Sequence, residues 1–133
     1  MTPLTIQVRF SDCDMMGHIN NAVYLNYFEQ ARMHYFEQLV GRNWDWRQHG
    51  IILKINEIEY FEPVFLNEIP QVIVKLKHIG NKSFTLAYEL FVGDKLKTKG
   101  SSVIVCFDFA KNQTMEMITE MRDALMKLEK VVV

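Results

Sequence analysis

The sequence predicts an α+β protein in which one long helix packs on one antiparallel sheet. Three observations lead to this prediction. Apolar residues recur between positions 24 and 39 at spacings of four and three, the period of an amphipathic helix. After residue 50, several segments with alternating or continuous apolar residues have the length of strands. Turns rich in glycine, asparagine and aspartate join neighbouring segments, as they do between antiparallel strands.

The amino-terminal part of the chain predicts a short strand and then the long helix. In residues 4–10, apolar and polar side chains alternate, as in a strand with one buried face. After the polar segment 11–21, Asn20 or Asn21 is placed to cap the helix, and Gly41 can end it in a left-handed conformation. The apolar stripe of the helix is broad, so we expect it to lie against a sheet. This stripe contains Tyr24, Leu25, Phe28, Ala31, Tyr35, Phe36, Leu39 and Val40.

Four further strands and a short helix are predicted after the long helix. The strands are expected at residues 51–61, 71–79, 83–92 and 97–109, which gives a sheet of about five strands. Segment 83–92 is apolar on both faces and is therefore expected at the centre of the sheet. The pairs Gly80-Asn81 and Gly93-Asp94 are typical of tight hairpins. Helical spacing of Ile118, Met121, Leu125 and Leu128 predicts the short last helix, with Thr119 as its cap.

Length, composition and charge limit the class of protein. The chain has 133 residues, and we expect one domain spanning 1–133 because no repeat or linker divides it. Apolar residues make up 49% of the sequence, which is enough to bury a core. Lys and Arg number 15 and Asp and Glu 16, and the resulting net charge of −1 argues against a nucleic-acid-binding protein.

We expect a cytoplasmic protein without a membrane span. No apolar run approaches the roughly 18 residues that cross a bilayer. Residues 1–5 have neither the basic lead nor the apolar stretch of a signal peptide. Cys13 and Cys106 cannot make a disulfide framework and do not lie in a CxxC spacing, so a reducing compartment fits.

Segment 9–21 stands apart because it concentrates polar chemistry between a strand and a buried helix. From Asp12 onward, it contains two carboxylates, an imidazole and two amides within ten residues. Loops held by rigid elements often carry functional sites. The same residue types also favour turns and caps, and Gly17 supplies a position for positive φ. Both interpretations are open on composition alone.

Metal binding fits this segment poorly. An EF-hand loop starting at Asp12 agrees at its third and sixth places, but it has Met16 at the fifth and Val23 at the twelfth, where a bidentate glutamate is needed. Asp12, Asp14 and His18 are suitable ligands for a transition metal, but no second His or Cys cluster completes the set. We therefore expect no metal site.

Acid–base or nucleophilic chemistry by a carboxylate fits better. Cys13 is a poor nucleophile, because Asp12 and Asp14 on either side would suppress its thiolate. The two aspartates would point to the same side of an extended segment, and their repulsion would favour protonation of one of them. A nearby helix amino terminus would act in the opposite direction, since its dipole stabilises the anion. The sequence leaves open which effect dominates.

The pattern over residues 9–32 resembles that of the hot-dog-fold thioesterases. The similarity is closest to the 4-hydroxybenzoyl-CoA thioesterase family of acyl-CoA hydrolases, and the DxD…HxNN segment of plant acyl-ACP thioesterases is also similar. The order of predicted elements agrees over nearly the whole chain. A pattern of this length, joining a strand to the expected helix, is far more specific than a short motif. The resemblance is carried by DCDMMGHINNAVY at residues 12–24 and EQAR at 29–32.

The resemblance implies a long central helix wrapped by one antiparallel β-sheet, in dimers or tetramers. The acting carboxylate of the family falls on Asp14, which either attacks the thioester carbonyl or activates a water. Either role is chemically reasonable, because CoA thiolate is a good leaving group and backbone N–H groups at a helix amino terminus can stabilise the oxyanion. His18 matches the family's Gly-His pair and is expected to orient Asp14 or the water, with a bond to the loop backbone as its alternative.

The predicted substrate-binding residues are Gly17, Asn20 and Tyr24. Gly17 belongs to the Gly-His pair and Asn20 to the Asn-Asn pair, for which helix capping is the alternative role. Tyr24 also lies on the apolar stripe, where core packing is the alternative. Asp12 is expected to shape the loop. Lysines at positions 75, 77, 95, 97 and 99 could meet the phosphates of CoA or keep a sheet face solvated.

These inferences predict a thioesterase that hydrolyses an acyl- or aroyl-CoA to the free acid and CoA. No cofactor is expected, since CoA is part of the substrate. The alternatives are an acyl-ACP thioesterase, which would take acyl carrier protein as partner, and a non-catalytic hot-dog module that binds acyl-CoA. The long helix would fill the concave side of the sheet and leave little room for an acyl chain. We therefore expect the site at the subunit interface of a homodimer or homotetramer.

Overall fold

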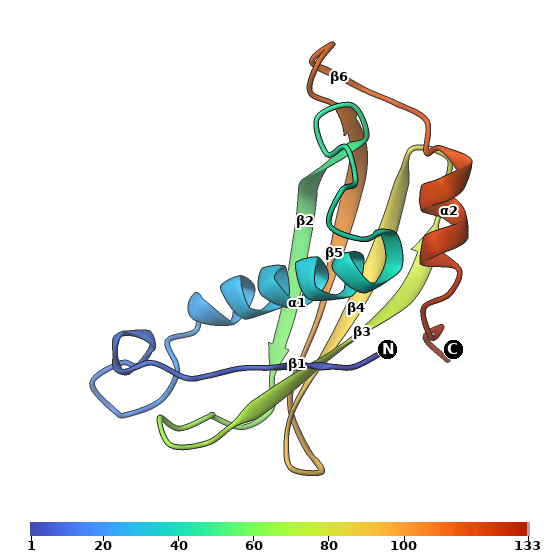
Figure 1. The fold of residues 1–133 in the computed structure, drawn as a ribbon. Coiled ribbons are helices and arrows are strands. Elements are labelled where there is room, and N and C mark those ends of the chain that lie inside the picture. The colour runs from blue at the N-terminus through green and yellow to red at the C-terminus, as the bar shows by residue number, and fades with distance from the viewer. Residues whose placement is uncertain (133) are drawn as a thin grey trace.

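In the computed structural model, which describes residues 1–132, one antiparallel sheet carries a long helix across one face (Figure 1). The sheet order is β1-β3-β4-β5-β2, and the short strand β6 pairs with the end of β5. This arrangement confirms the predicted α+β class. The elements are β1 (Leu4–Thr5), a 3-10 turn η1 (Phe10–Asp12), α1 (Val23–Val40), β2 (Gly50–Tyr60), β3 (Pro70–Ile79), β4 (Ser83–Val92), β5 (Lys95–Asp108), β6 (Gln113–Thr114) and α2 (Thr119–Leu125).

Helix α1 forms where the apolar spacing predicts it, but its amino terminus is made differently. The N-cap residue is Ala22, which has no capping side chain. The side chain of Asn20 instead accepts the N–H of Ala22 at 3.0 Å, and the carbonyl of Asn20 accepts that of Val23 at 2.9 Å. At the other end, Gly41 has a φ of +79° and its N–H bonds to the carbonyl of Glu37, as expected of a glycine that ends a helix.

The buried face of α1 packs on the centre of the sheet. Strand β4 lies between β3 and β5, which confirms the predicted central strand. Phe28 of α1 stacks on Tyr88 of β4 with ring centroids 4.6 Å apart and nearly parallel planes. Arg32, one turn further on, is buried and donates from Nη1 to the Tyr88 hydroxyl at 3.1 Å. These contacts fix the rotation of the helix on the sheet.

The first strand is shorter than predicted. The alternation over residues 4–10 predicts a strand, but the pairing with β3 covers only Leu4 and Thr5. After Ile6 bonds to the Pro70 carbonyl, the chain leaves the sheet and curls into η1, where Phe10 is 85% exposed. Ile6 is buried and Val8 packs against the core, so the alternation reflects burial of these side chains without strand pairing beyond Thr5.

Strand β2 forms one edge of the sheet. It pairs with β5 over its whole length, and within residues 1–132 no strand pairs with its other edge. Three apolar side chains on this edge strand are exposed, namely Ile52 at 37%, Leu53 at 46% and Ile55 at 45%. None of the helices in the described part of the chain is long and apolar enough to cross a membrane.

Candidate active site

The polar loop that precedes α1 is a narrow hairpin closed at its base by Asp12. The carbonyl of Asp12 accepts the N–H of Asn20 at 2.8 Å. One step further into the loop, the N–H of Asp14 donates to the carbonyl of His18 at 2.7 Å. At the tip, Gly17 has a φ of +78°, a left-handed conformation that glycine adopts without strain. The loop thus has its own hydrogen-bonded frame.

The far arm of the loop is attached to the segment that follows β2. The N–H of Ile19 donates to the carbonyl of Val64 at 2.9 Å. The neighbouring residue, His18, forms a β-bridge with Phe65, and its imidazole meets the Phe65 ring edge-on at a centroid distance of 4.8 Å. These contacts place the loop between the start of α1 and the end of β2.

The loop backbone orients the carboxylate of Asp14. Its Oδ1 accepts the N–H of Met16 at 2.9 Å and the N–H of His18 at 3.2 Å. Its Oδ2 accepts no hydrogen bond from the described part of the chain. An oriented carboxylate with one oxygen free is suited to attack a carbonyl or to take a proton from water.

A cavity of about 300 Å³ lies beside Asp14. It is bounded by the loop, the start of α1, the end of β2 and the residues that follow β2. Aromatic walls with a few polar groups are typical of small-molecule sites. The lining residues are Asp14, His18, Ile19, Asn21, Tyr24, Tyr60, Phe61, Glu62 and Pro63.

Two tyrosines of this cavity are hydrogen-bond donors and not bases. Tyr24 is buried and its ring meets that of Tyr60 edge-on, with centroids 5.1 Å apart. The hydroxyl of Tyr60 donates to the carbonyl of Asn21 at 2.7 Å, which joins the end of β2 to the start of α1. Burial raises the pKa of both phenols, so they stay protonated at neutral pH.

The second carboxylate of the cavity, Glu62, is paired with lysines. Its Oε1 lies 2.9 Å from Nζ of Lys95 and its Oε2 lies 3.7 Å from Nζ of Lys97. The hydrogen bond from Lys95 lowers the pKa of Glu62. Asp14 makes no ion pair with a residue of the range 1–132. Glu62 is therefore held in ion pairs, whereas the carboxylate of Asp14 is not, within the described residues.

The structure brings some of the predicted site residues together and not others. Asp14, His18 and Tyr24 all line the cavity. Gly17 makes the turn at the loop tip, and Asn20 binds the Ala22 N–H, so neither lines it. Whether each residue acts as predicted stays a prediction. The sequence reasoning missed five lining residues, of which the first two lay in the recognised motif: Ile19, Asn21, Tyr60, Glu62 and Pro63.

The carboxylate of Asp12 forms its hydrogen bonds outside the cavity. Its Oδ2 accepts the hydroxyl of Tyr27, on α1, at 2.6 Å and the N–H of Arg9 at 3.0 Å. Its carboxylate is thus directed to the helix and does not line the cavity. Within residues 1–132, no three His, Cys, Asp or Glu side chains gather closely enough to hold a metal ion.

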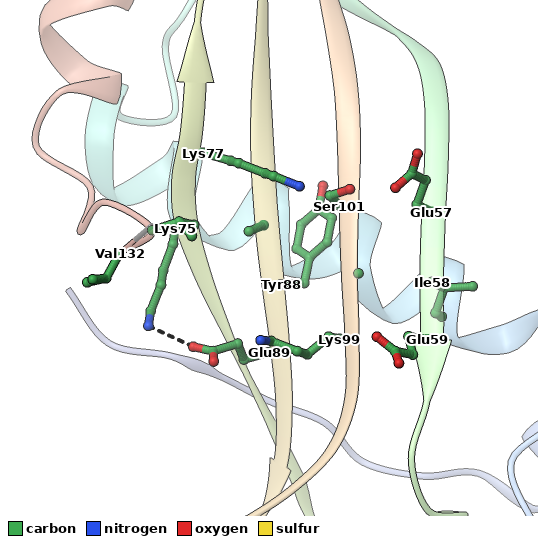
Figure 2. Close-up of a pocket in the computed structure, with 13 residues that line it drawn as sticks. Glu57, Ile58, Glu59, Lys75, Lys77, Tyr88, Glu89, Lys99, Ser101 and Val132 are labelled. Carbon is green, nitrogen blue, oxygen red and sulfur yellow. Dashed lines mark ion pairs between the residues drawn. The ribbon is translucent and has the colours of Figure 1, made fainter.

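The five lysines noted in the sequence do not form one basic patch. Lys75 lies on the outer face of the sheet, where its Nζ is 2.8 Å from Oε1 of Glu89 (Figure 2). Lys95 and Lys97 instead pair with Glu62 beside the cavity. The outer face also has a trough of about 450 Å³ in which lysine and glutamate side chains are mixed (Figure 2). The outer face of the sheet thus carries both positive and negative side chains.

Comparison with known proteins identifies the class. Residues 8–125 match the thioesterase-like superfamily, and because this range is most of the chain, the protein belongs to that superfamily. It is a thioester hydrolase, as the loop motif predicts. The long-chain acyl-CoA thioesterase FadM of Escherichia coli is 25% identical over 128 residues, or 94% of this chain and 97% of FadM. The uncharacterized protein YsmA of Bacillus subtilis is 34% identical over 85 residues, or 62% of this chain and 56% of YsmA.

Solved structures share the whole fold. A thioesterase of Thermus thermophilus, complexed with coenzyme A and Zn, has a TM-score of 0.82 at 28% identity, covering 92% of this chain and 95% of that one. A predicted thioesterase of Bacillus stearothermophilus has a TM-score of 0.86 at 25% identity, covering 96% and 95% of the two chains. The implied hot-dog fold, a long helix on one antiparallel sheet with a short carboxy-terminal helix, is confirmed.

Proposed function

We propose that this protein hydrolyses the thioester bond of an acyl- or aroyl-CoA, with Asp14 as the acting carboxylate. The observation that carries the proposal is the position of Asp14, whose Oδ1 is held by two backbone N–H groups at the wall of an aromatic cavity. The superfamily supports the reaction class, and FadM, named a long-chain acyl-CoA thioesterase, supports CoA as the carrier. The aromatic walls are compatible with an aroyl group, as in the 4-hydroxybenzoyl-CoA family, as well as with an alkyl chain.

Asp14 can act by two chemical routes from this position. As a general base, Asp14 takes a proton from a water whose oxygen attacks the carbonyl carbon. As a nucleophile, its free oxygen attacks that carbon to give a mixed anhydride, which water then cleaves. In both routes the carbon–sulfur bond breaks and CoA leaves as the thiolate. We propose that backbone N–H groups where α1 begins stabilise the oxyanion, since Asn21 and Tyr24 at that place line the cavity.

We assign His18 to the water or the substrate and not to the Asp14 side chain. The group of His18 that bonds to Asp14 is its backbone N–H. Its imidazole lines the cavity and makes no hydrogen bond within residues 1–132. The ring nitrogens are therefore available to a molecule in the cavity. No metal or other cofactor has a part in the proposed reaction.

We further propose that the working unit is a homodimer or homotetramer with the site at a subunit interface, in the cytoplasm. The unpaired edge of β2, with its exposed apolar side chains, supports a second chain there. We refer to residues 12–20 as the catalytic loop. Apolar side chains are also exposed on this loop and beside it: Met15 at 96%, Met16 at 73% and Phe65 at 41%. A partner chain would cover such a surface and deepen the cavity.

The test is an assay of thiol release. The substrates are acyl-CoAs of increasing chain length, benzoyl-CoA and 4-hydroxybenzoyl-CoA, and the corresponding acyl carrier protein thioesters test the alternative carrier. Asp14→Asn keeps an oxygen for the two N–H donors but removes the base and nucleophile, so we expect kcat to fall by about 100-fold or more. Asp94→Asn, in the exposed β4–β5 turn, is the matched control and should act as wild type. Full activity in Asp14→Asn, or no release by the wild type, would overturn the proposal.

A further inference from the structure

We propose that Tyr27 and Asp12 form an anchor that holds the catalytic loop in its active geometry, so that both are positioning residues for the reaction. This inference rests on the function proposed above, because it concerns how Asp14 is placed. It gives a structural basis to the expectation that Asp12 shapes the loop while Asp14 acts. Asp14 acts on the substrate, and Asp12 acts through Asp14.

The first half of the anchor is a buried phenol on α1. Tyr27 is 3% exposed, and its hydroxyl donates to Oδ2 of Asp12 at 2.6 Å. This is the short distance typical of a hydroxyl bound to a charged carboxylate. Burial, with a further contribution from Asp12, raises the pKa of Tyr27, so the phenol remains a donor at any pH of an assay. The phenol can therefore donate this bond at neutral pH.

The second half of the anchor is the position of Asp12 at the base of the loop. The same Oδ2 accepts the N–H of Arg9 at 3.0 Å, which closes the η1 turn. The carbonyl of Asp12 accepts the N–H of Asn20, on the outgoing arm of the loop. Asp12 thus connects the segment that enters the loop, the segment that leaves it and, through Tyr27, the buried face of α1.

Asp14 lies on the incoming arm of the loop, which Asp12 holds to α1, whereas the outgoing arm is held separately by the bond from Ile19 to Val64. Met15 and Met16, which flank the tip, are 96% and 73% exposed. The two N–H groups that orient Asp14 belong to the loop itself. If the base shifts relative to α1, Asp14 therefore moves with it, whereas Tyr24, which lines the cavity from α1, does not. Misplacement by about 1 Å can lower catalysis by about 100-fold.

The test compares four variants by kcat and KM. Tyr27→Phe and Asp12→Ala each remove the bond, and we expect kcat to fall by about 10- to 100-fold with KM little changed. Asp12→Asn keeps an oxygen that can accept from both Tyr27 and Arg9, so we expect kcat within about threefold of wild type. Tyr35→Phe is the matched control, since Tyr35 is another buried tyrosine of α1, near the backbone of Val74, and should retain wild-type kcat.

The second readout does not require activity. Deuterium uptake by a peptide covering residues 13–20 should rise in Tyr27→Phe and Asp12→Ala but not in Asp12→Asn or Tyr35→Phe. If the wild type hydrolyses no thioester, the proposed function fails, and the uptake pattern still decides whether the anchor exists. Loss of activity in Asp12→Asn comparable with Asp14→Asn would make Asp12 a catalytic carboxylate and overturn the inference. Wild-type kcat and uptake in Tyr27→Phe would also overturn it.

Discussion

At the scale of single residues, the charge state of the cavity depends on Glu62 and its lysines. Lys95 lowers the pKa of Glu62 below its ordinary value of 4.5. A carboxyl group with a lowered pKa in the folded state stabilises the protein above its unfolded-state pKa, and this contribution is lost as pH falls through the folded-state pKa. We therefore expect Glu62→Gln to be less stable than wild type at neutral pH, with the difference shrinking as pH falls through the lowered folded-state pKa of Glu62.

Thermal midpoints of the two proteins between pH 3 and pH 8 measure this difference. The matched control is Glu59→Gln, which changes an exposed glutamate of β2 that makes no ion pair within residues 1–132. The thermal midpoint of this control should follow that of the wild type at every pH. Because the pair is half-exposed, the effect will be small. A stability difference independent of pH would contradict the assignment.

The two aspartates show what a sequence can and cannot assign at this scale. The motif marks both Asp12 and Asp14, and the carboxylate chemistry follows from residue type alone. Their different partners do not, since the Tyr27 hydroxyl that binds Asp12 is 15 residues away and reaches it only because α1 folds back on the loop. The lining by Tyr60 and Glu62 could not be seen for the same reason, because residues at and after the end of β2 meet the loop only in the folded chain.

At the scale of elements, the contact of α1 with the sheet depends on a glycine of β5. A Cβ on Gly100 would lie 2.5 Å from Cε2 of Phe28 and 3.0 Å from the carbonyl oxygen of Glu57. A shift of Phe28 away from this Cβ would disturb its ring stacking on Tyr88. We expect Gly100→Ala to lower the free energy of unfolding by about 1–3 kcal/mol, as overpacking does.

Urea denaturation of Gly100→Ala measures this loss. Ser101→Ala is the control, because Ser101 is the neighbouring residue of β5 and lines the trough on the outer face of the sheet (Figure 2). It should unfold within about 0.5 kcal/mol of wild type. If Gly100→Ala were as stable as wild type, α1 would not pack on the sheet as closely as the structure shows.

Elements with a strong apolar period were predictable, and those set by local hydrogen bonds were not. The spacing of Tyr24, Phe28 and Tyr35 predicts α1, and a segment apolar on both faces predicts the central β4; both are confirmed. The predicted first strand pairs only at Leu4 and Thr5, and at its far end the bond from the Arg9 N–H to Asp12 holds the chain in a turn. Polar side chains that choose local backbone partners can override an alternating pattern in this way.

At the scale of the whole molecule, the exposed edge of the sheet at β2 indicates a surface for a second chain. Strand β2 is long, and its free backbone groups and apolar side chains form a surface that a second chain could pair with. The cavity lies at the end of the same strand, where Tyr60 and Phe61 line it. An assembly through β2 would therefore bring a second chain close to Asp14. A variant that no longer oligomerises should then also lose activity.

A double variant, Ile52→Lys with Ile55→Lys, tests this expectation. Both side chains are exposed, so the fold of one chain should survive, but charges on an edge strand oppose pairing with another strand. We expect the wild type to be dimeric or tetrameric by light scattering and the double variant to be monomeric with at least about tenfold lower kcat. Ile69→Lys adds a charge at a more exposed position between β2 and β3 and should change neither property. A monomeric double variant with full activity would show that one chain holds a complete site, and a monomeric wild type would remove the interface altogether.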